Sequence, residues 1–131
     1  MSRSKKNTEK CKEEIPIPFT EICMYQVKPE KVDEFERLMP EVKDFLEKQD
    51  GLLLLRLVKR EYHIDMDQIK EGLPPKKITR IVKSVKFLLY WEFATKEQYG
   101  IAQKNLYTTY WKAIEKLLVV PHDKYLGETL L

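Results

Sequence analysis

The chain has 131 residues, of which 43% are hydrophobic and 34% are charged, and its formal net charge is +3 at pH 7. This length and apolar content are typical of one globular domain with a buried core. The first fourteen residues contribute +2 of the charge, so the remaining 117 residues carry only +1. Such a balance argues against nucleic-acid binding, which concentrates basic charge on the folded domain.

The cysteine content and hydropathy pattern favour a soluble protein of a reducing compartment. Two cysteines, Cys11 and Cys23, are too few for the disulfide framework of a small secreted protein. No apolar run follows the basic residues near the N-terminus, as a signal peptide would require. No stretch reaches the roughly 18 consecutive apolar residues of a membrane-spanning helix. We therefore expect a cytoplasmic protein with no membrane partner.

The predicted elements begin after a polar N-terminal segment. Residues 1–15 lack hydrophobic periodicity, so we expect a disordered or loosely attached tail there, followed by a single domain over residues 16–131. Residues 19–27 alternate in the manner of a β-strand. One face of this strand carries Cys23, Tyr25 and Val27, and the other carries Ile22, Met24 and Gln26.

A helix is predicted from Pro29 to Gln49. Proline suits the first helical turn, because its missing N–H would have no partner there. Gly51 can adopt the left-handed conformation that commonly ends a helix. Apolar residues recur every three or four positions and form one stripe, which consists of Val32, Phe35, Leu38, Met39, Val42, Phe45 and Leu46.

Two strands separated by a long loop are expected next. Residues 52–62 begin with four leucines, which predicts burial of both faces at that end. Residues 63–79 predict a loop, with one or two helical turns over residues 65–71. Residues 80–93 predict the third strand. One face of it carries Ile81, Val85, Phe87, Leu89, Trp91 and Phe93, and the other carries Val82, Ser84, Lys86, Leu88, Tyr90 and Glu92.

The last part of the chain predicts a second long helix and a short strand. Thr95 and Gln98 have the spacing of a capping box and begin the helix. The helix is expected to end near Val119, because Pro121 cannot continue it. Its apolar residues cover more than one narrow stripe, which predicts contact with two neighbours. Residues 122–131 predict the final strand.

The order strand, helix, strand, strand, helix, strand is that of the ferredoxin-like fold, an α+β fold with an antiparallel sheet. Two helices can cover only one face of its four-stranded sheet. Residues 52–55 and 87–91 are nevertheless apolar on both faces. A second copy of the chain would bury the uncovered face. We therefore expect a homodimer with two-fold symmetry that forms a dimeric α+β barrel.

Three short motifs carry a family resemblance. Residues 25–35 read YQVKPEKVDEF, a strand followed by an acid-rich helix; residues 49–52 read QDGL, a turn; residues 90–98 read YWEFATKEQ, a strand-to-helix junction. Together these motifs resemble dimeric α+β barrel proteins of the antibiotic biosynthesis monooxygenase-like superfamily. The resemblance extends from Thr20 to Leu131, and it indicates the fold more than the chemistry.

The resemblance implies a choice among three activities. Members of this superfamily oxidise electron-rich aromatic molecules without a cofactor, degrade haem, or only bind small ligands. Haem-degrading members carry an asparagine on the first strand, and a tryptophan and a histidine on the second helix. The corresponding positions here hold Ile22 or Cys23, Gly100 and Tyr110. Haem degradation is therefore not expected, and no cofactor is predicted.

A cofactor-free oxygenase needs a dry pocket, an electron-rich substrate and a base that forms the substrate anion. His63 lies where the second strand ends, and an imidazole suits this task because it titrates near neutral pH. We therefore take His63 as the candidate catalytic residue, although an exposed loop histidine would fit the same position. His122, which follows Pro121, is the weaker candidate.

Aromatic residues on the third strand and the second helix are candidates for substrate binding in a pocket between these elements. Aromatic residues at these spacings equally fit a core or a dimer interface. The candidate residues are Tyr90, Trp91, Tyr107, Tyr110 and Trp111.

The remaining polar candidates have simpler interpretations. Glu92 and Arg56 are charges within apolar strands, and they could pair with each other or hold a ligand. Cys23 has no basic neighbour in the sequence, so we expect a buried and inert thiol. His63 with Asp65 and Asp67 lacks a recognised metal-binding spacing, so no metal is predicted.

Two functional hypotheses follow. The first is a monooxygenase-like enzyme that acts on a small aromatic or polyketide-like molecule in a pocket between sheet and helices. The second is a non-catalytic dimer of the same fold that binds a small ligand or another partner.

Overall fold

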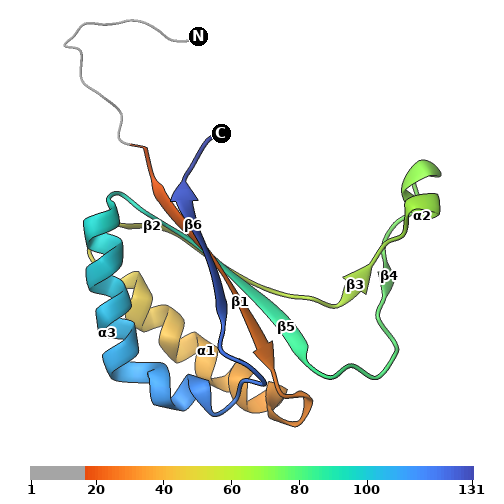
Figure 1. Cartoon of the computed structure of the whole chain (residues 1–131), viewed down its shortest axis with the longest axis horizontal. Coiled ribbons are helices and arrows are strands. Elements are labelled where there is room, and N and C mark those ends of the chain that lie inside the picture. Colours follow the sequence, from red (N-terminus) through yellow and green to blue (C-terminus); the bar gives the residue numbers. More distant parts are fainter. Residues whose placement is uncertain (1–16) are drawn as a thin grey trace, which may run out of the picture.

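A computed structural model describes residues 17–131 and gives the elements in the predicted order (Figure 1). The tail expected at residues 1–15 lies outside the described residues. The elements are β1 (Phe19–Val27), the 3₁₀ turn η1 (Pro29–Lys31), α1 (Val32–Glu47), β2 (Leu52–Lys59), β3 (Tyr62–His63), α2 (Met66–Lys70), β4 (Lys76–Lys77), β5 (Val85–Phe93), α3 (Lys96–Glu115) and β6 (Asp123–Glu128).

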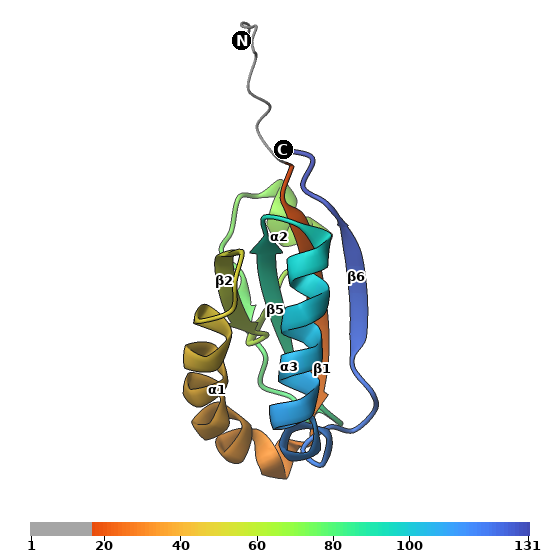
Figure 2. The same ribbon diagram turned by 90° about the vertical axis from the view of Figure 1, so that its left-hand side faces the viewer.

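The four long strands form one antiparallel sheet in the order β2-β5-β1-β6. Both α1 and α3 lie on the same side of this sheet, as the two ribbon views agree (Figures 1 and 2). The strand order and the single helical layer are those of the ferredoxin-like α+β fold, so the predicted fold class is confirmed.

The helix-covered face of the sheet holds the core. Tyr25 and Val27 of β1 are buried there together with Phe87 and Trp91 of β5, as the alternation of these strands predicted. Phe35 of α1 packs on both strands, with its ring centroid 5.7 Å from that of Tyr25 and 4.6 Å from that of Phe87. The core therefore fixes β1 and β5 as the centre of the sheet.

The other face of the sheet is covered by nothing in the described chain, and we call it the open face. Cross-strand pairing places Ile22 of β1 between Tyr90 of β5 and Tyr125 of β6 on this face, and Val58 of β2 beside Leu88 of β5. Ile22, Val58, Leu88 and Tyr125 are exposed. An apolar sheet face in water is typical of an interaction surface.

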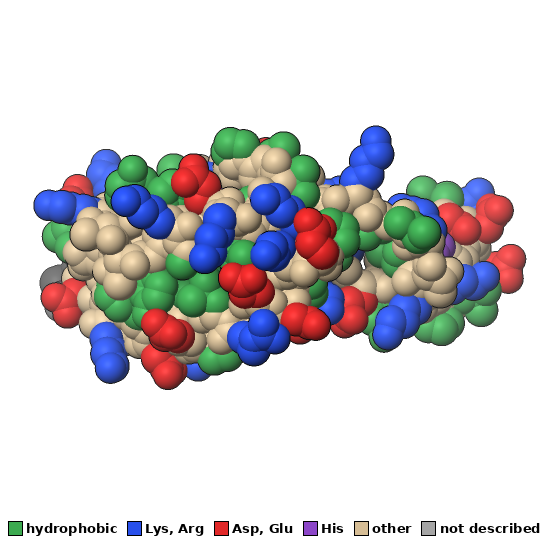
Figure 3. Space-filling view, turned by 90° about the horizontal axis from the view of Figure 1, so that it is seen from below, with side chains coloured by type: hydrophobic (Ala, Val, Ile, Leu, Met, Phe, Trp, Pro, Cys, Tyr) green, Lys and Arg blue, Asp and Glu red, His purple; other side chains and the backbone are tan. Residues whose placement is uncertain are grey.

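Residues 60–84 form an arm that leaves the sheet between β2 and β5. In it β3 pairs with β4, and α2 stands at the tip, so the arm appears as a separate lobe in the space-filling view (Figures 1 and 3). Asp65 and Gln68 make a reciprocal capping box at the start of α2, with both bonds 2.9 Å long. The helical turn expected within residues 65–71 is confirmed.

The structure corrects three predicted boundaries, the first two of them at the ends of the arm. β2 ends at Lys59 and not at residue 62, β5 begins at Val85 and not at residue 80, and α3 ends at Glu115. Ile81 was expected to share the buried face of Val85, but it lies outside the strand and is 99% exposed. Alternation predicts a strand only where a partner strand is present, and β2 has already left the sheet at this point.

The turn between α1 and β2 yields a first testable prediction. Gly51 has φ of +86°, and a Cβ atom placed on it would lie 2.0 Å from Oε1 of Gln98. Gly51→Ala should therefore lower the free energy of unfolding by about 1–3 kcal/mol, because it combines a strained φ with displacement of Gln98.

Gly100→Ala is the matched control for this substitution, since Gly100 lies within α3 and its added Cβ would meet no atom within 4 Å. That variant should gain about 0.5–1 kcal/mol, because alanine favours the helix. Urea unfolding of both variants gives the comparison. Equal stabilities would contradict the assigned conformation of the turn.

Candidate functional site: a pocket between the sheet and α3

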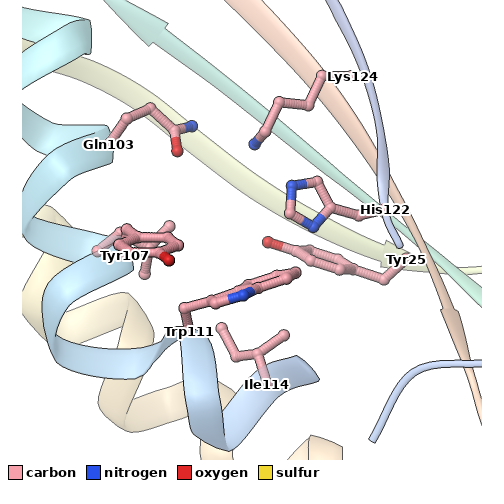
Figure 4. A pocket seen from close by; sticks show the side chains of 8 residues that line it. Tyr25, Gln103, Tyr107, Trp111, Ile114, His122 and Lys124 are labelled. Carbon is pink, nitrogen blue, oxygen red and sulfur yellow. The ribbon is translucent and has the colours of Figure 1, made fainter. Parts of the chain in front are cut away.

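A cavity of about 300 Å³ lies between the helix-covered face of the sheet and α3 (Figure 4). This volume is at the lower end of the range for small-molecule sites, which is about 300–1,000 Å³. The lining is largely aromatic and apolar, with a few polar groups. The lining residues are Tyr25, Gln103, Leu106, Tyr107, Trp111, Ile114, His122 and Lys124.

Regular structure brings these residues together. On α3, Gln103, Tyr107 and Trp111 follow one another at intervals of four residues and therefore lie on one side of the helix. On the opposite wall, Lys124 of β6 pairs with Cys23 of β1, so its side chain points to the helix-covered face. His122 precedes β6 by one residue and lies on the same face, with its ring beside those of Tyr25 and Trp111 (Figure 4).

A fully buried carboxylate lies behind the polar end of the pocket. Glu21 of β1 has no exposed surface, and its Oε2 lies 2.8 Å from Nζ of Lys124. The hydroxyl of Tyr99 donates to the same oxygen at 2.7 Å. Oε1 accepts from Nε2 of Gln103 at 3.0 Å and from the indole N–H of Trp91.

This network explains how a charge is tolerated in the core. A buried carboxylate is stable only when it is paired and its oxygens accept hydrogen bonds, and Glu21 has both. The network also fixes the rotamers of Gln103 and Lys124, which reach the pocket from opposite walls (Figure 4). It therefore positions two polar groups at one end of an otherwise apolar cavity.

His122 is the group in the pocket best suited to accept a proton. Its ring centroid lies 4.8 Å from that of Trp111 at an interplanar angle of 82°, and 5.5 Å from that of Tyr25. Burial lowers the pKa of His122 below its usual value of 6.5, and the positive charge of Lys124 lowers it further. The imidazole is therefore neutral at pH 7. Its Nδ1 is buried and has no hydrogen-bond partner within residues 17–131.

One cysteine and two tyrosines are also buried near the pocket, and their raised pKa values keep them protonated at neutral pH. Burial raises the pKa of the Cys23 thiol to about 11, so the thiol stays protonated at neutral pH, in agreement with the expected inert thiol. The pKa values of Tyr25 and Tyr99 are also raised, in both cases mainly by burial, and the hydrogen bond to Glu21 raises that of Tyr99 further. These two hydroxyls can donate hydrogen bonds but do not serve as bases.

The structure divides the predicted aromatic residues among three places. Tyr107 and Trp111 line the pocket, and their stacked rings lie 6.3 Å apart. Trp91 is fully buried behind the pocket, and its indole N–H donates a hydrogen bond to Glu21. Tyr90 lies on the open face, where its hydroxyl donates to Glu92.

Tyr110 and His63 also lie away from the pocket. Tyr110 faces α1, with its hydroxyl donating to Glu41 at 2.8 Å and its ring against that of Phe45. His63 is exposed in β3 of the arm, which projects from the opposite side of the molecule to α3 (Figure 1). Neither residue therefore lines the α3 pocket.

The sequence interpretation missed the polar end of the pocket, which consists of Glu21, Gln103 and Lys124. One signal was present, because Glu21 continues the buried row of Cys23 and Tyr25 in β1, and a carboxylate at such a position requires partners. Gln103 and Lys124 carried no comparable signal. Their approach to Glu21 depends on the register of β6 and on the position of α3.

A larger groove of about 440 Å³ runs between α1 and the edge strand β2, but its lining has fewer side chains suited to catalysis. Its lining is mainly apolar. Among its charged groups, Glu36 pairs with Lys59 at 2.7 Å and Lys43 pairs with Glu47 at 2.8 Å. The groove holds no histidine, whereas the α3 pocket holds one.

Two further features of the described chain bear on the kind of site. Within residues 17–131, no three side chains of histidine, cysteine, aspartate or glutamate gather as metal ligands. None of the helices in that range is long and apolar enough to cross a bilayer.

Comparison with known proteins supports the fold. No family model matches the chain, and no curated protein matches it by sequence. Among solved structures, a candidate antibiotic biosynthesis monooxygenase from Nitrosomonas europaea is similar, with a TM-score of 0.62, 12% sequence identity, and coverage of 88% of this chain and 92% of that chain.

Two Streptomyces proteins are also similar. The cofactor-independent oxygenase SnoaB from Streptomyces nogalater has a TM-score of 0.56 and 13% identity, over 87% of this chain and 96% of that chain. The monooxygenase from the gene ActVA-Orf6 of Streptomyces coelicolor, solved with the ligand nanaomycin D, has a TM-score of 0.55 and 12% identity, over 87% and 88%. At these identities the likeness concerns fold. The chain thus shares its ferredoxin-like α+β fold with these monooxygenases, and this is the fold that the resemblance of its sequence motifs predicted.

Proposed function

We propose that the chain is a cofactor-independent, monooxygenase-like enzyme that oxidises a small aromatic or polyketide-like molecule in the α3 pocket. The observation that carries this proposal is the neutral imidazole of His122 within an aromatic cavity, beside the cationic side chain of Lys124. An aromatic wall suits a planar substrate, and a neutral imidazole suits proton abstraction. This assignment places the catalytic base at His122 in place of His63.

The proposed reaction begins with removal of a proton from an acidic C–H bond of the substrate, such as the central CH₂ of an anthrone. His122 accepts this proton. The resulting carbanion is delocalised onto an oxygen of the substrate, and the ammonium group of Lys124 and the amide of Gln103 are the polar groups at hand to stabilise it.

The electron-rich anion then reduces dioxygen, a new C–O bond forms, and the resulting peroxide takes the proton held by His122 to give a hydroperoxide. The neutral His122 removes the remaining proton from the same carbon as the O–O bond breaks, so that the electron pair of the C–H bond forms the carbonyl group. The departing hydroxide takes this second proton from His122 and leaves as water. One CH₂ group and one O₂ thus yield one carbonyl group and one H₂O. No external reductant or metal enters this balance.

The test uses 1,8-dihydroxyanthrone with the full chain in air-saturated buffer. We expect one O₂ to be consumed for each anthraquinone formed, at a rate above that of the protein-free solution. Without oxygen the same ligand should quench the fluorescence of Trp111 but give no quinone, and Trp111→Phe should lose this quenching. Failure to accelerate oxidation of anthrones or hydroquinones would contradict the enzyme proposal.

The alternative is a non-catalytic pocket that binds the same class of ligand. Its support is that Lys124 is already paired with Glu21, so its charge is partly neutralised before any ligand arrives. In that case anthrone binding would be seen without oxygen uptake. The free thiol of Cys23 is compatible with the cytoplasmic location that the sequence predicts, for either function.

We also propose that two copies form a homodimer through the open face. The support is the exposure of Ile22, Val58, Leu88 and Tyr125 on a face that no described element covers. A second sheet packed face to face, with its backbone about 10 Å from that of the first, would bury these side chains between the two sheets. Sedimentation equilibrium should give twice the chain mass of 15.7 kDa. A mass of 15.7 kDa at all concentrations would contradict the dimer.

A further inference from the structure

The arm, residues 60–84, carries a concentration of exposed apolar side chains that its own structure cannot bury. Its short hairpin and the five-residue helix α2 are too small to hold a core of their own. The large apolar side chains with exposed fractions between 41% and 99% are Tyr62, Ile64, Met66, Ile69, Leu73 and Ile81. A surface of this kind is typical of an interaction site.

The arm projects on the side of the sheet opposite to the helices. In Figure 1 the helices lie to the left of the sheet and the arm to the right, and in Figure 2 the helices stand in front of the sheet and α2 behind it. The arm and the open face therefore border the same space. A partner that packs on the open face would also meet the arm.

The charge of the returning half of the arm favours a second copy of the chain as the partner, whereas residues 60–71 of the outgoing half carry four acidic and two basic residues. Residues 72–91 contain four lysines and one arginine but no acidic residue, and most of this segment is the returning half of the arm. On the open face, the row of β5 reads Lys86, Leu88, Tyr90 and Glu92, so this row is basic near the arm and acidic at its far end, where Arg56 of β2 lies beside Tyr90. The charges of two such rows are therefore complementary when the rows run in opposite directions.

Two-fold symmetry decides how the copies can align. The axis of a face-to-face dimer lies between the sheets, parallel to both. An axis along the strands would place the two basic arm segments beside each other, which is unfavourable. An axis across the strands reverses the partner, so that Lys86 and the arm lie over the partner's acidic end near its Glu92.

We infer that the arm clasps a second copy of the chain, with its apolar side chains on the partner and its basic segment over the partner's acidic end. This inference rests on the homodimer proposed above but concerns a separate contact. The clasp extends the interface beyond the open face and fixes the relative direction of the two sheets.

Ile69→Asp tests the clasp. Ile69 is 53% exposed in α2, so the substitution should leave the fold of the single chain intact. We expect the dimer dissociation constant from sedimentation equilibrium to rise by about tenfold or more, because a charge would enter an apolar contact. The matched control is Ile101→Asp on α3, where Ile101 is 63% exposed outside the proposed interface and should have no effect.

Two further variants separate the clasp from the dimer. Leu88→Asp on the open face should dissociate the dimer whether or not the arm takes part. A dimer that Leu88→Asp weakens and Ile69→Asp does not would overturn the clasp and leave the dimer standing. Charge reversal tests the alignment: Lys86→Glu and Glu92→Lys should each weaken the dimer, and the double variant should recover affinity. Additive losses in the double variant would overturn the reversed alignment.

Discussion

Replacing His122 with asparagine should lower kcat/KM for anthrone oxidation by a factor of about 10²–10⁴, the usual contribution of a general base. Asparagine keeps a polar group of similar size between Tyr25 and Trp111 but cannot accept a proton. Oxygen uptake gives the rate, and quenching of Trp111 fluorescence under nitrogen gives the affinity. We expect the affinity to change far less than the rate, because the aromatic walls of the pocket remain.

His63→Asn provides the matched control, because the chain contains two histidines and His63 lies exposed in the arm. The same chemical change should leave oxygen uptake at the wild-type level. If the asparagine at position 63 abolished turnover and the one at position 122 did not, His63 would be the base, as the sequence predicts, and the α3 pocket would not be the catalytic site.

The pH dependence offers an independent check on the same residue. Burial and Lys124 hold the pKa of His122 below 6.5, so the base form should persist to a lower pH than for an exposed histidine. The kcat/KM of the wild type should reach its maximum at high pH and fall to half of it at a pH below 6.5, where His122 is half protonated. A half-maximal rate at a pH above 6.5 would exclude His122 as the base.

The same shift has a consequence for stability. Because the pKa of His122 is lower in the folded chain than in the unfolded chain, the unfolded chain binds the proton more readily. The stabilising contribution is complete above pH 6.5 and is lost as the pH falls through the folded-state pKa. The asparagine variant should lack this part of the acid dependence, which urea unfolding between pH 7 and pH 5 would measure.

The fold could be predicted because each of its determinants is local. Alternation in residues 19–27, the apolar stripe of α1 and the Thr95 cap each define an element without reference to the rest of the chain. The order of these elements then leaves few topologies. The start of β5 depends on the presence of a partner strand, which the local pattern does not show. Alternation alone therefore extended the predicted strand wrongly to include Ile81.

The candidate site could be predicted only in part, because its groups come from distant segments. Trp111 and Tyr107 were found as aromatic residues of a helix next to the sheet. His122 and Lys124 lie about a hundred residues from Glu21, and only the pairing of β6 with β1 brings them together. A histidine after a proline carries no local sign of the desolvation that makes it a base.

Replacing Lys124 with methionine should lower the free energy of unfolding by about 2–4 kcal/mol, because it leaves the carboxylate of Glu21 buried without its countercharge. Glu21 has no exposed surface, while the side chain of Lys124 is 29% exposed, so we place the loss somewhat below that of a fully buried pair. The midpoint of urea unfolding gives the measurement.

The Lys43→Met variant is the matched control, because it removes an ion pair of the same length whose carboxylate is not buried. Lys43 and Glu47 are also 2.8 Å apart, but both are well exposed, so the loss of this pair should not shift the urea midpoint measurably. The double variant Glu21→Gln with Lys124→Met should regain most of the stability lost in Lys124→Met, since the amide oxygen can accept from Trp91 and Gln103 while the amide nitrogen donates to the hydroxyl of Tyr99. If Lys124→Met were as mild as Lys43→Met, or if the double variant regained nothing, the buried charge would not be what makes Lys124 necessary. The outcome bears on function as well, because the carboxylate that requires Lys124 also holds it beside His122 in the pocket.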